Sequence, residues 1–165
     1  MGKCMGFLIV LLAHATAFSQ VVSVEFKDKG LLFSDTPTLS FVWPAKQAKA
    51  TLVFIPGGEG RLGITPERTG LGGFYGATLK PLSDERSGRG AFHVVVFDSP
   101  VNLPVGTDYP TSRQNSEHLL RIESVVRHFK TRYDLPVWIM GHSNGAVSIT
   151  EFYKMLQKNH QENLV

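Results

Sequence analysis

The sequence has 165 residues, of which 42% are hydrophobic and 19% charged, and its formal net charge is +3. This composition is ordinary for a soluble globular domain, and it excludes long disorder, collagen and a disulfide-stapled mini-protein. The length favours one domain. The small charge surplus is spread thinly along the chain, so it gives no electrostatic support for a nucleic-acid partner.

The N-terminal segment has the three-part layout of a secretory signal peptide. A basic start at Lys3 precedes an apolar run over 5–13, and the small residues of 15–19 provide the cleavage site. A membrane anchor is the alternative, but about nine apolar residues are far fewer than the roughly 20 that span a bilayer. We therefore predict a signal peptide over 1–19, a secreted or periplasmic protein, and no stable membrane insertion after the signal is removed.

The single cysteine, Cys4, lies inside this segment. The mature chain would then have no disulfide, no thiol nucleophile and no thiolate metal site. No spacing of His, Asp and Glu suggests a metal. We therefore expect neither a metal nor a cofactor.

Five short segments are typical of β-strands. The first two, 21–27 and 38–43, contain β-branched and aromatic residues and are separated by turn residues. The other three, 51–55, 92–97 and 137–140, are continuous apolar runs that each stop at a turn. Strands that are apolar on both faces belong in the interior of a parallel sheet covered by helices.

Helices are predicted between and after these strands. The strongest pattern follows Asn115, which could cap the helix, as could Ser112, and its apolar side chains recur at helical spacing: Leu119, Ile122, Val126 and Phe129. A second helix is predicted over 144–158, and a short one near 74–79 that ends at Pro81. Alternating strands and helices predict an α/β fold with a parallel sheet, whose functional edge lies at the carboxyl ends of the strands.

The pentapeptide Gly141-His142-Ser143-Asn144-Gly145 fits G-x-S-x-G where an apolar strand meets an amphipathic helix. A serine hydroxyl is a weak nucleophile, so it must stand on a sharp turn that a base and the substrate can both reach. Side chains at the two outer positions would collide where strand and helix approach, which explains the glycines. We predict a nucleophile elbow with Ser143 as the nucleophile; the alternative is a turn whose serine merely caps the helix.

A glycine-rich loop, Pro56-Gly57-Gly58-Glu59-Gly60, follows an earlier predicted strand. Glycines let the backbone approach a ligand and turn N–H groups towards it. In an acyl-transfer site such donors bind the developing oxyanion, and each one contributes about 3 kcal/mol. We predict that Gly58 and the N–H of Asn144, where the helix dipole favours negative charge, form this oxyanion hole. The alternative is a flexible surface loop.

The order of these elements resembles the N-terminal half of the α/β-hydrolase superfamily. It consists of a strand with a Gly-Gly loop, a strand ending in Asp98, a helix, a strand, the elbow and a final helix. The resemblance is greatest to small secreted or periplasmic bacterial hydrolases, and it covers about 21–158. The loop departs from the lipase-type H-G-G-G, with Pro56 in place of His and Glu59 inside the turn. The resemblance implies an incomplete α/β-hydrolase sheet, mostly parallel, in which 20–165 is the N-terminal part of the domain.

The superfamily order of nucleophile, acid and histidine places the last two beyond Val165. Within the sequence His118 is the least implausible substitute base; the alternative is a solvated histidine on a helix face. Asp98 is expected to hold together the loop that follows its strand by accepting backbone N–H groups. Arg61 and Arg113 could contact an acidic group of a substrate. A solvated helix face is expected for five charged residues: Glu117, Arg121, Glu123, Arg127 and Lys130.

These patterns predict a serine hydrolase that cleaves small-molecule carboxylic esters through an acyl-serine. Amides, thioesters and lactones remain open, because the fold does not select among them. The alternative is a non-catalytic binding module that keeps the fold. The sequence sets no oligomeric state, but 135–140 would form an apolar edge strand. We therefore expect the 165-residue chain alone to be poorly soluble and inactive.

Overall fold

The structure, a computed structural model, describes residues 19–26, 36–87, 92–99 and 113–165. The predicted signal peptide, apart from Ser19, lies outside these ranges. The strands are β1 (Gln20–Val24), β2 (Thr38–Trp43), β3 (Ala50–Ile55), β4 (Phe92–Phe97) and β5 (Val137–Gly141). The α-helices are α1 (Gly73–Leu79), α3 (Ser116–Tyr133) and α4 (Asn144–Lys158), and the 3-10 turns are η1 (Lys80–Ser83), η2 (Glu85–Ser87) and η3 (Glu162–Leu164).

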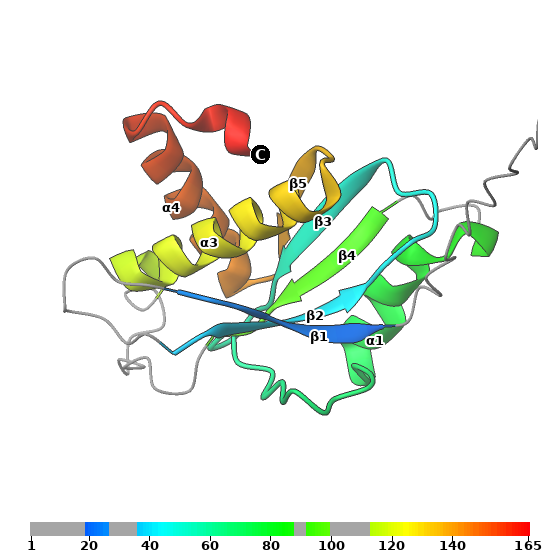
Figure 1. Ribbon diagram of the computed structural model, residues 1–165. Coiled ribbons are helices and arrows are strands. Elements are labelled where there is room, and N and C mark those ends of the chain that lie inside the picture. The colour runs from blue at the N-terminus through cyan, green and yellow to red at the C-terminus, as the bar shows by residue number, and fades with distance from the viewer. Residues whose placement is uncertain (1–18, 27–35, 88–91, 100–112) are drawn as a thin grey trace, which may run out of the picture.

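The five strands form one sheet in the order β1-β2-β4-β3-β5. β3 pairs in parallel with β4 and with β5, whereas β2 pairs antiparallel with both β1 and β4. Four strands therefore run in one direction and only β2 is reversed (Figure 1). The carboxyl ends of β3, β4 and β5 consequently lie along one edge of the sheet.

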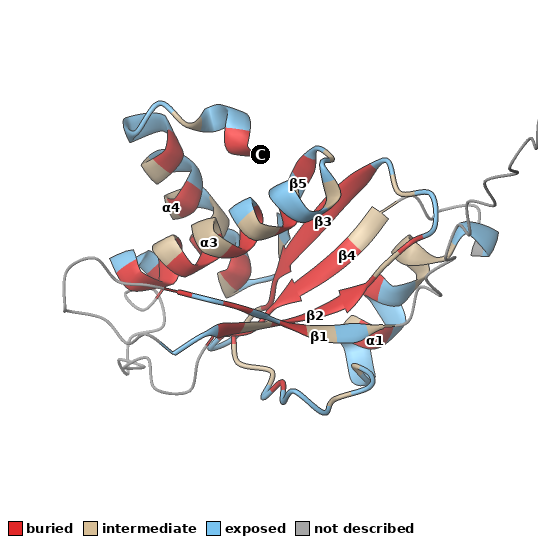
Figure 2. Cartoon of the chain, viewed as in Figure 1, coloured by how far each residue is buried: buried red, intermediate tan, exposed pale blue. Residues whose placement is uncertain are grey.

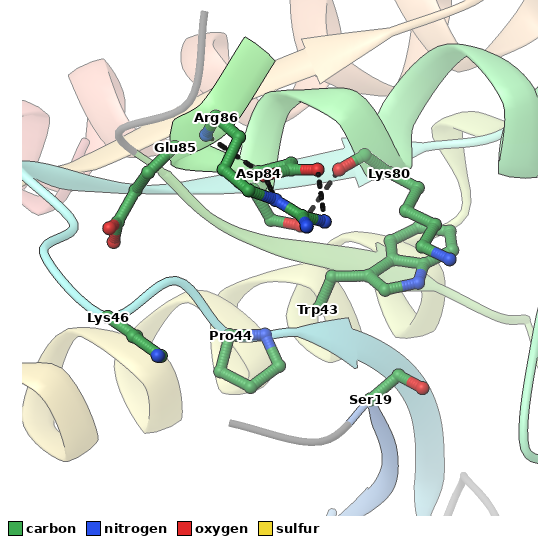
Figure 3. A pocket seen from close by; sticks show the side chains of 9 residues that line it. Ser19, Trp43, Pro44, Lys46, Lys80, Asp84, Glu85 and Arg86 are labelled. Carbon is green, nitrogen blue, oxygen red and sulfur yellow. Dashed lines mark hydrogen bonds and ion pairs between the residues drawn. The ribbon is translucent and has the colours of Figure 1, made fainter. Parts of the chain in front are cut away.

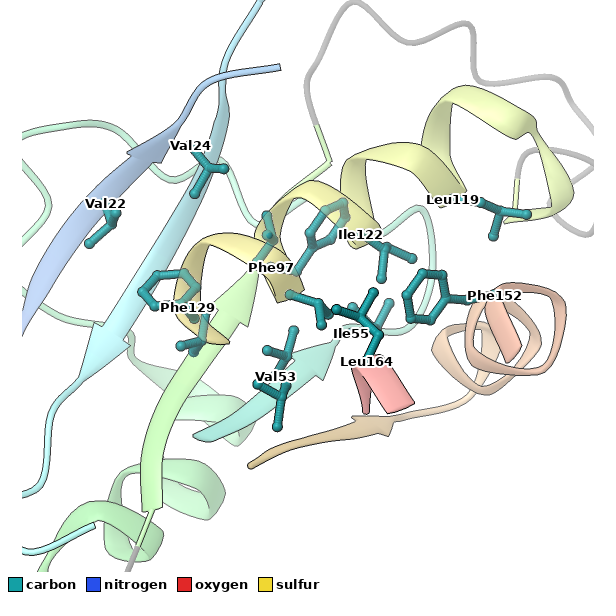
Figure 4. Close-up of a cluster of buried hydrophobic side chains, with 14 of the residues drawn as sticks. Val22, Val24, Val53, Ile55, Phe97, Leu119, Ile122, Phe129, Phe152 and Leu164 are labelled. Atoms are coloured by element: carbon teal, nitrogen blue, oxygen red, sulfur yellow. The ribbon is translucent and has the colours of Figure 1, made fainter. Parts of the chain in front are cut away.

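Helices cover both faces of the sheet. α3 and α4 pack on one face, where Val53, Ile55 and Phe97 of the strands meet Phe129 and Phe152 of the helices (Figure 4). α1 and η1 lie on the other face (Figure 1), where a second apolar cluster forms: Phe41, Trp43, Phe54, Ile64, Leu79, Val94 and Val96. Neighbouring residues of β3 and β4 thus belong to different clusters, which is why these strands are buried on both faces (Figure 2).

The predicted elements are confirmed, with small shifts at their ends. The second and fourth strands and the last helix have the predicted bounds. β1 ends at Val24, earlier than expected, and the short α-helix gives way at Leu79 to a 3-10 turn that contains Pro81. Asn115 caps α3, because its Oδ1 accepts the N–H of Glu117 at 2.8 Å.

The solvated face predicted for α3 is wrong for two of its five residues. Glu117 is 6% exposed and Arg121 is fully buried, and the two form an i,i+4 ion pair at 2.6 Å. Arg121 also donates to the carbonyl oxygen of Thr36 at 2.6 Å and lies 4.2 Å from the ring centre of Phe26. The residues that flank β1 and β2 therefore cover this part of α3, which a charge pattern along one helix cannot reveal.

Candidate active site

Ser143 stands on the sharp turn between β5, which ends at Gly141, and α4, which begins at Asn144. Its backbone has φ 53° and ψ −123°, a conformation that non-glycine residues rarely adopt. The turn is closed by two hydrogen bonds of 2.8 Å, from Gly145 N–H to His142 O and from Ala146 N–H to Ser143 O. The serine side chain is exposed at the carboxyl edge of the sheet.

The glycines of the elbow stand where no side chain fits. A Cβ on Gly141 would lie 2.6 Å from the carbonyl carbon and oxygen of Gly145. A Cβ on Gly145 would overlap the carbonyl oxygen of Ile55 at the end of β3. The strand, the turn and the helix are therefore in backbone contact, and this contact fixes the position of Ser143 beyond the end of β5.

The glycine-rich loop 56–60 lies against this turn. A Cβ on Gly57 would be 3.1 Å from the Cβ of Ser143, and the side-chain amide of Asn144 lies 3.5 Å from the carbonyl oxygen of Gly58. Gly58 and Gly60 have φ of 58° and 76°, which suits glycine. Within the described residues, neither the N–H of Gly58 nor that of Asn144 donates to a protein acceptor. The structure therefore brings the predicted oxyanion donors and Ser143 to one place.

An aromatic cluster of α1 flanks the elbow. The Tyr75 hydroxyl lies 3.3 Å from Nδ1 of His142 and accepts the N–H of Gly57 at 2.9 Å. The exposed ring of Phe74 packs against His142 with 5.3 Å between ring centres. These contacts hold the side chain of His142 against α1. Tyr75 and Phe74 were not predicted as site residues, because nothing in the sequence links α1 to the elbow.

Arg113 does not lie at the surface, and the predicted contact with a substrate is wrong. Its side chain is 1% exposed, and its Nη2 lies within hydrogen-bond distance of three carbonyl oxygens of the loop: Pro56 at 2.9 Å, Gly57 at 3.1 Å and Gly58 at 2.7 Å. Arg61 is less buried and pairs with Glu59 at 3.9 Å. Arg113 is therefore occupied by the protein's own backbone.

His118 is not the solvated histidine that was expected. It is 3% exposed, its Nε2 lies 2.9 Å from Oγ of Ser148 in α4, and Phe97 packs edge-on against its ring. Burial, and then the charges of Arg113 and Arg121, lower the pKa of His118 to about 3. The His118 ring is therefore buried and neutral at physiological pH, and its contact with Ser148 joins α3 to α4.

Asp98 accepts backbone N–H groups, as expected, but from the loop before α1; the loop that follows its own strand lies outside the described residues from position 100. Its two carboxylate oxygens accept the N–H groups of Leu62 at 2.5 Å and Ile64 at 2.7 Å. Burial raises the pKa of Asp98, and the two backbone donors act in the opposite direction. The carboxylate ties the end of β4 to the loop that precedes α1.

No hydrogen bond joins the Ser143 hydroxyl to another described residue, and Nε2 of His118 contacts Ser148 instead. The same ranges contain no group of three or more His, Cys, Asp or Glu that could hold a metal ion. No helix in the part of the chain that the structure describes is long and apolar enough to cross a bilayer.

A pocket of about 510 Å³ lies away from this site (Figure 3). Trp43 forms part of its wall, and Trp43 pairs with Val94, towards the amino end of β4. Its other lining residues are Ser19, Pro44, Lys46, Lys80, Ser83, Asp84, Glu85 and Arg86. The pocket therefore faces the edge of the sheet opposite Ser143.

No protein-family model matches the chain, and no curated protein matches it in sequence. Among solved structures it is similar to brefeldin A esterase, a bacterial homologue of human hormone-sensitive lipase, with a TM-score of 0.55 and 12% identity. The match covers 96% of this chain and 41% of the esterase chain, so the chain spans less than half the length of that structure. At this identity the likeness shows the fold alone, which is the α/β fold of part of an α/β-hydrolase.

Proposed function

We propose that this chain carries the nucleophile and the oxyanion-binding loop of a serine hydrolase of the α/β-hydrolase superfamily. The observation that supports the proposal most directly is the position of Ser143, exposed on a strained turn beside the N–H groups of Gly58 and Asn144, for which the described residues provide no acceptor. Backbone strain of this kind costs about 1–3 kcal/mol and is characteristic of functional sites.

The proposed reaction is the hydrolysis of small-molecule carboxylic esters. The Ser143 oxygen attacks the carbonyl carbon while its proton passes to a histidine, which the superfamily order places beyond Val165. The carbonyl oxygen becomes an oxyanion held by the N–H groups of Gly58 and Asn144. Collapse breaks the bond to the alcohol, which takes up the proton, and water then releases the acid from the acyl-serine.

The test is labelling by a fluorophosphonate probe of the protein expressed from its complete reading frame. We expect covalent labelling that is lost in Ser143→Ala and retained in Ser124→Ala. Ser124 is the control because its hydroxyl donates to the carbonyl of Leu120 within α3. Hydrolysis of p-nitrophenyl acetate should follow the same pattern. Labelling that survives Ser143→Ala, or a folded protein that is never labelled, would contradict the proposal.

A second candidate, a binding module without catalysis, is favoured by the outer edge of the sheet. β5 is an edge strand, and its Trp138 and Met140 are 58% and 46% exposed. Such an edge can pair with a strand of another chain. A folded, unlabelled protein that binds a partner through β5 would support this candidate over the hydrolase.

We also propose that 1–19 directs export, to the outside of the cell or to the periplasm. The N-terminal sequence of the mature protein tests this proposal. We expect the mature chain to begin at Gln20, and an exported chain that still begins at Met1 would contradict cleavage.

A further inference from the structure

Arg113 is a buried cation without a carboxylate partner among the described residues. Besides the three carbonyl groups of the loop, its Nη1 lies 3.4 Å from Oγ of Ser148 in α4. Its guanidinium also fills the space beside Gly60, where a Cβ would come within 2.5 Å of Nη1. Burial lowers the pKa of Arg113, yet an arginine stays protonated in a protein. A charge buried in this way is costly, and its hydrogen bonds to the loop offset the cost.

The contacts of Arg113 determine which way the peptide groups of the loop point. A trans peptide is planar, so its C=O and N–H point in opposite directions. The carbonyls of Pro56, Gly57 and Gly58 all point to one guanidinium. The N–H groups of the same three peptides belong to Gly57, Gly58 and Glu59, and they point away from Arg113.

The first of these N–H groups has a partner beside the elbow. The N–H of Gly57 donates to the Tyr75 hydroxyl at 2.9 Å, and that hydroxyl lies 3.3 Å from Nδ1 of His142, the neighbour of Ser143. The carbonyl side of the loop therefore faces Arg113, and its N–H side faces the elbow. The N–H of Gly58 has no acceptor among the described residues.

We infer that Arg113 is a positioning residue of the oxyanion hole: its buried guanidinium aligns the peptides of the loop so that the N–H of Gly58 faces the substrate carbonyl at Ser143. The inference rests on the proposed function. The planar fork of arginine suits this task better than the ammonium of lysine, which acts as a point charge. Through Ser148, Arg113 also joins the loop to α4.

Amide hydrogen exchange tests the positioning without any catalysis. In Arg113→Met we expect the Gly57 N–H to exchange at least about tenfold faster, because its peptide is no longer held in one orientation. Arg113→Lys should give a smaller increase, and it replaces Arg113→Met in this comparison if that variant does not fold. Arg121→Lys is the matched control, since Arg121 is also fully buried but contacts Glu117 and Thr36 instead of the loop.

Labelling kinetics test the consequence for the oxyanion hole. Removal of one oxyanion donor lowers kcat by about 10²–10³-fold, so we expect misalignment in Arg113→Met to slow fluorophosphonate labelling by roughly 10- to 100-fold. With p-nitrophenyl acetate the loss should appear in kcat while KM stays within about threefold, with partial recovery in Arg113→Lys and no loss in Arg121→Lys. A merely structural role would lower the amount of folded enzyme and leave its kcat unchanged.

The inference is overturned if Arg113→Met folds, keeps slow exchange at Gly57 and is labelled at the parental rate. Failure of the proposed function gives a different result. The unsubstituted protein would then be labelled independently of Ser143, or would not be labelled at all. In that event the exchange of the Gly57 N–H alone decides whether Arg113 aligns the loop.

Discussion

The backbone of Gly145 lies directly against the carbonyl oxygen of Ile55, with no room between them for a methyl group. The contact joins the start of α4 to the end of β3, and the N–H of His142 donates to the same carbonyl at 3.2 Å. Because the two segments meet through their backbones, neither can shift without breaking the pairing of β3 with β5. The position of the elbow therefore depends on this contact.

Replacement of Gly145 by alanine should destabilise the fold strongly. The added Cβ would overlap the Ile55 carbonyl, which belongs to a central strand and cannot move, so we expect a loss of about 3 kcal/mol in the free energy of unfolding. Gly70→Ala is the control, since a Cβ there meets open space, and it should change stability by less than about 0.5 kcal/mol. Urea unfolding measures both variants, and equal midpoints would contradict the contact.

Strain at Ser143 should reverse the usual order of alanine and glycine. Glycine adopts φ 53° and ψ −123° without strain, so Ser143→Gly should be about 1 kcal/mol more stable than Ser143→Ala, even after the entropy cost of glycine in the unfolded chain. In the middle of α3 the order should be normal, with Ser124→Gly about 1 kcal/mol less stable than Ser124→Ala. Thermal unfolding of the four variants tests this, and the same order at both sites would show that the turn is unstrained.

Acid should destabilise the protein through His118. Its pKa is lowered to about 3 in the folded state and is about 6.5 when unfolded, so the unfolded chain takes up the proton first as the pH falls. The contribution of neutral His118 is complete above pH 6.5 and is lost progressively below it. We expect a loss of about 2 kcal/mol between pH 7 and pH 5.

The control for this pH dependence is His118→Gln, which keeps a polar partner for Ser148 but does not titrate. Denaturant unfolding at pH 7 and pH 5 should show a smaller loss in this variant than in the parent. Burial also lowers the pKa values of His93 and His128, so a residual loss is expected. An unchanged loss in His118→Gln would place the acid sensitivity elsewhere.

The outer edge of β5 should promote self-association of the 165-residue chain. In the described ranges β5 pairs with β3 alone, and Met140 is 46% exposed beside this open edge. Met140→Lys should lower the association measured by analytical ultracentrifugation. Tyr153→Lys is the matched control, because Tyr153 is equally exposed but lies on α4. If the two substitutions lower association equally, the exposed apolar area in general causes it, and the edge of β5 does not.

The elements were predictable because their signals are local. A continuous apolar run such as 92–97, or apolar side chains at the spacing of Ile122 and Phe129, depends only on neighbours within the same segment. The elbow was predictable for the same reason, since strand, glycines and helix are contiguous around Ser143. For Asp98 only the kind of contact was predictable: an aspartate after a strand commonly accepts backbone N–H groups, but the donors Leu62 and Ile64 lie more than 30 positions away, in the loop before α1.

The sequence by itself thus determined the succession of strands and helices along the chain and the motif that presents Ser143. Only the tertiary structure decided the environments of Arg113, Arg121 and His118, three residues that a charge or helix pattern assigns to the surface. Each is buried by partners more than 25 positions away in the chain: Gly58 for Arg113, Thr36 for Arg121 and Ser148 for His118. Burial of a polar side chain is decided by which segments pack over it, and that information is absent from its neighbours in sequence.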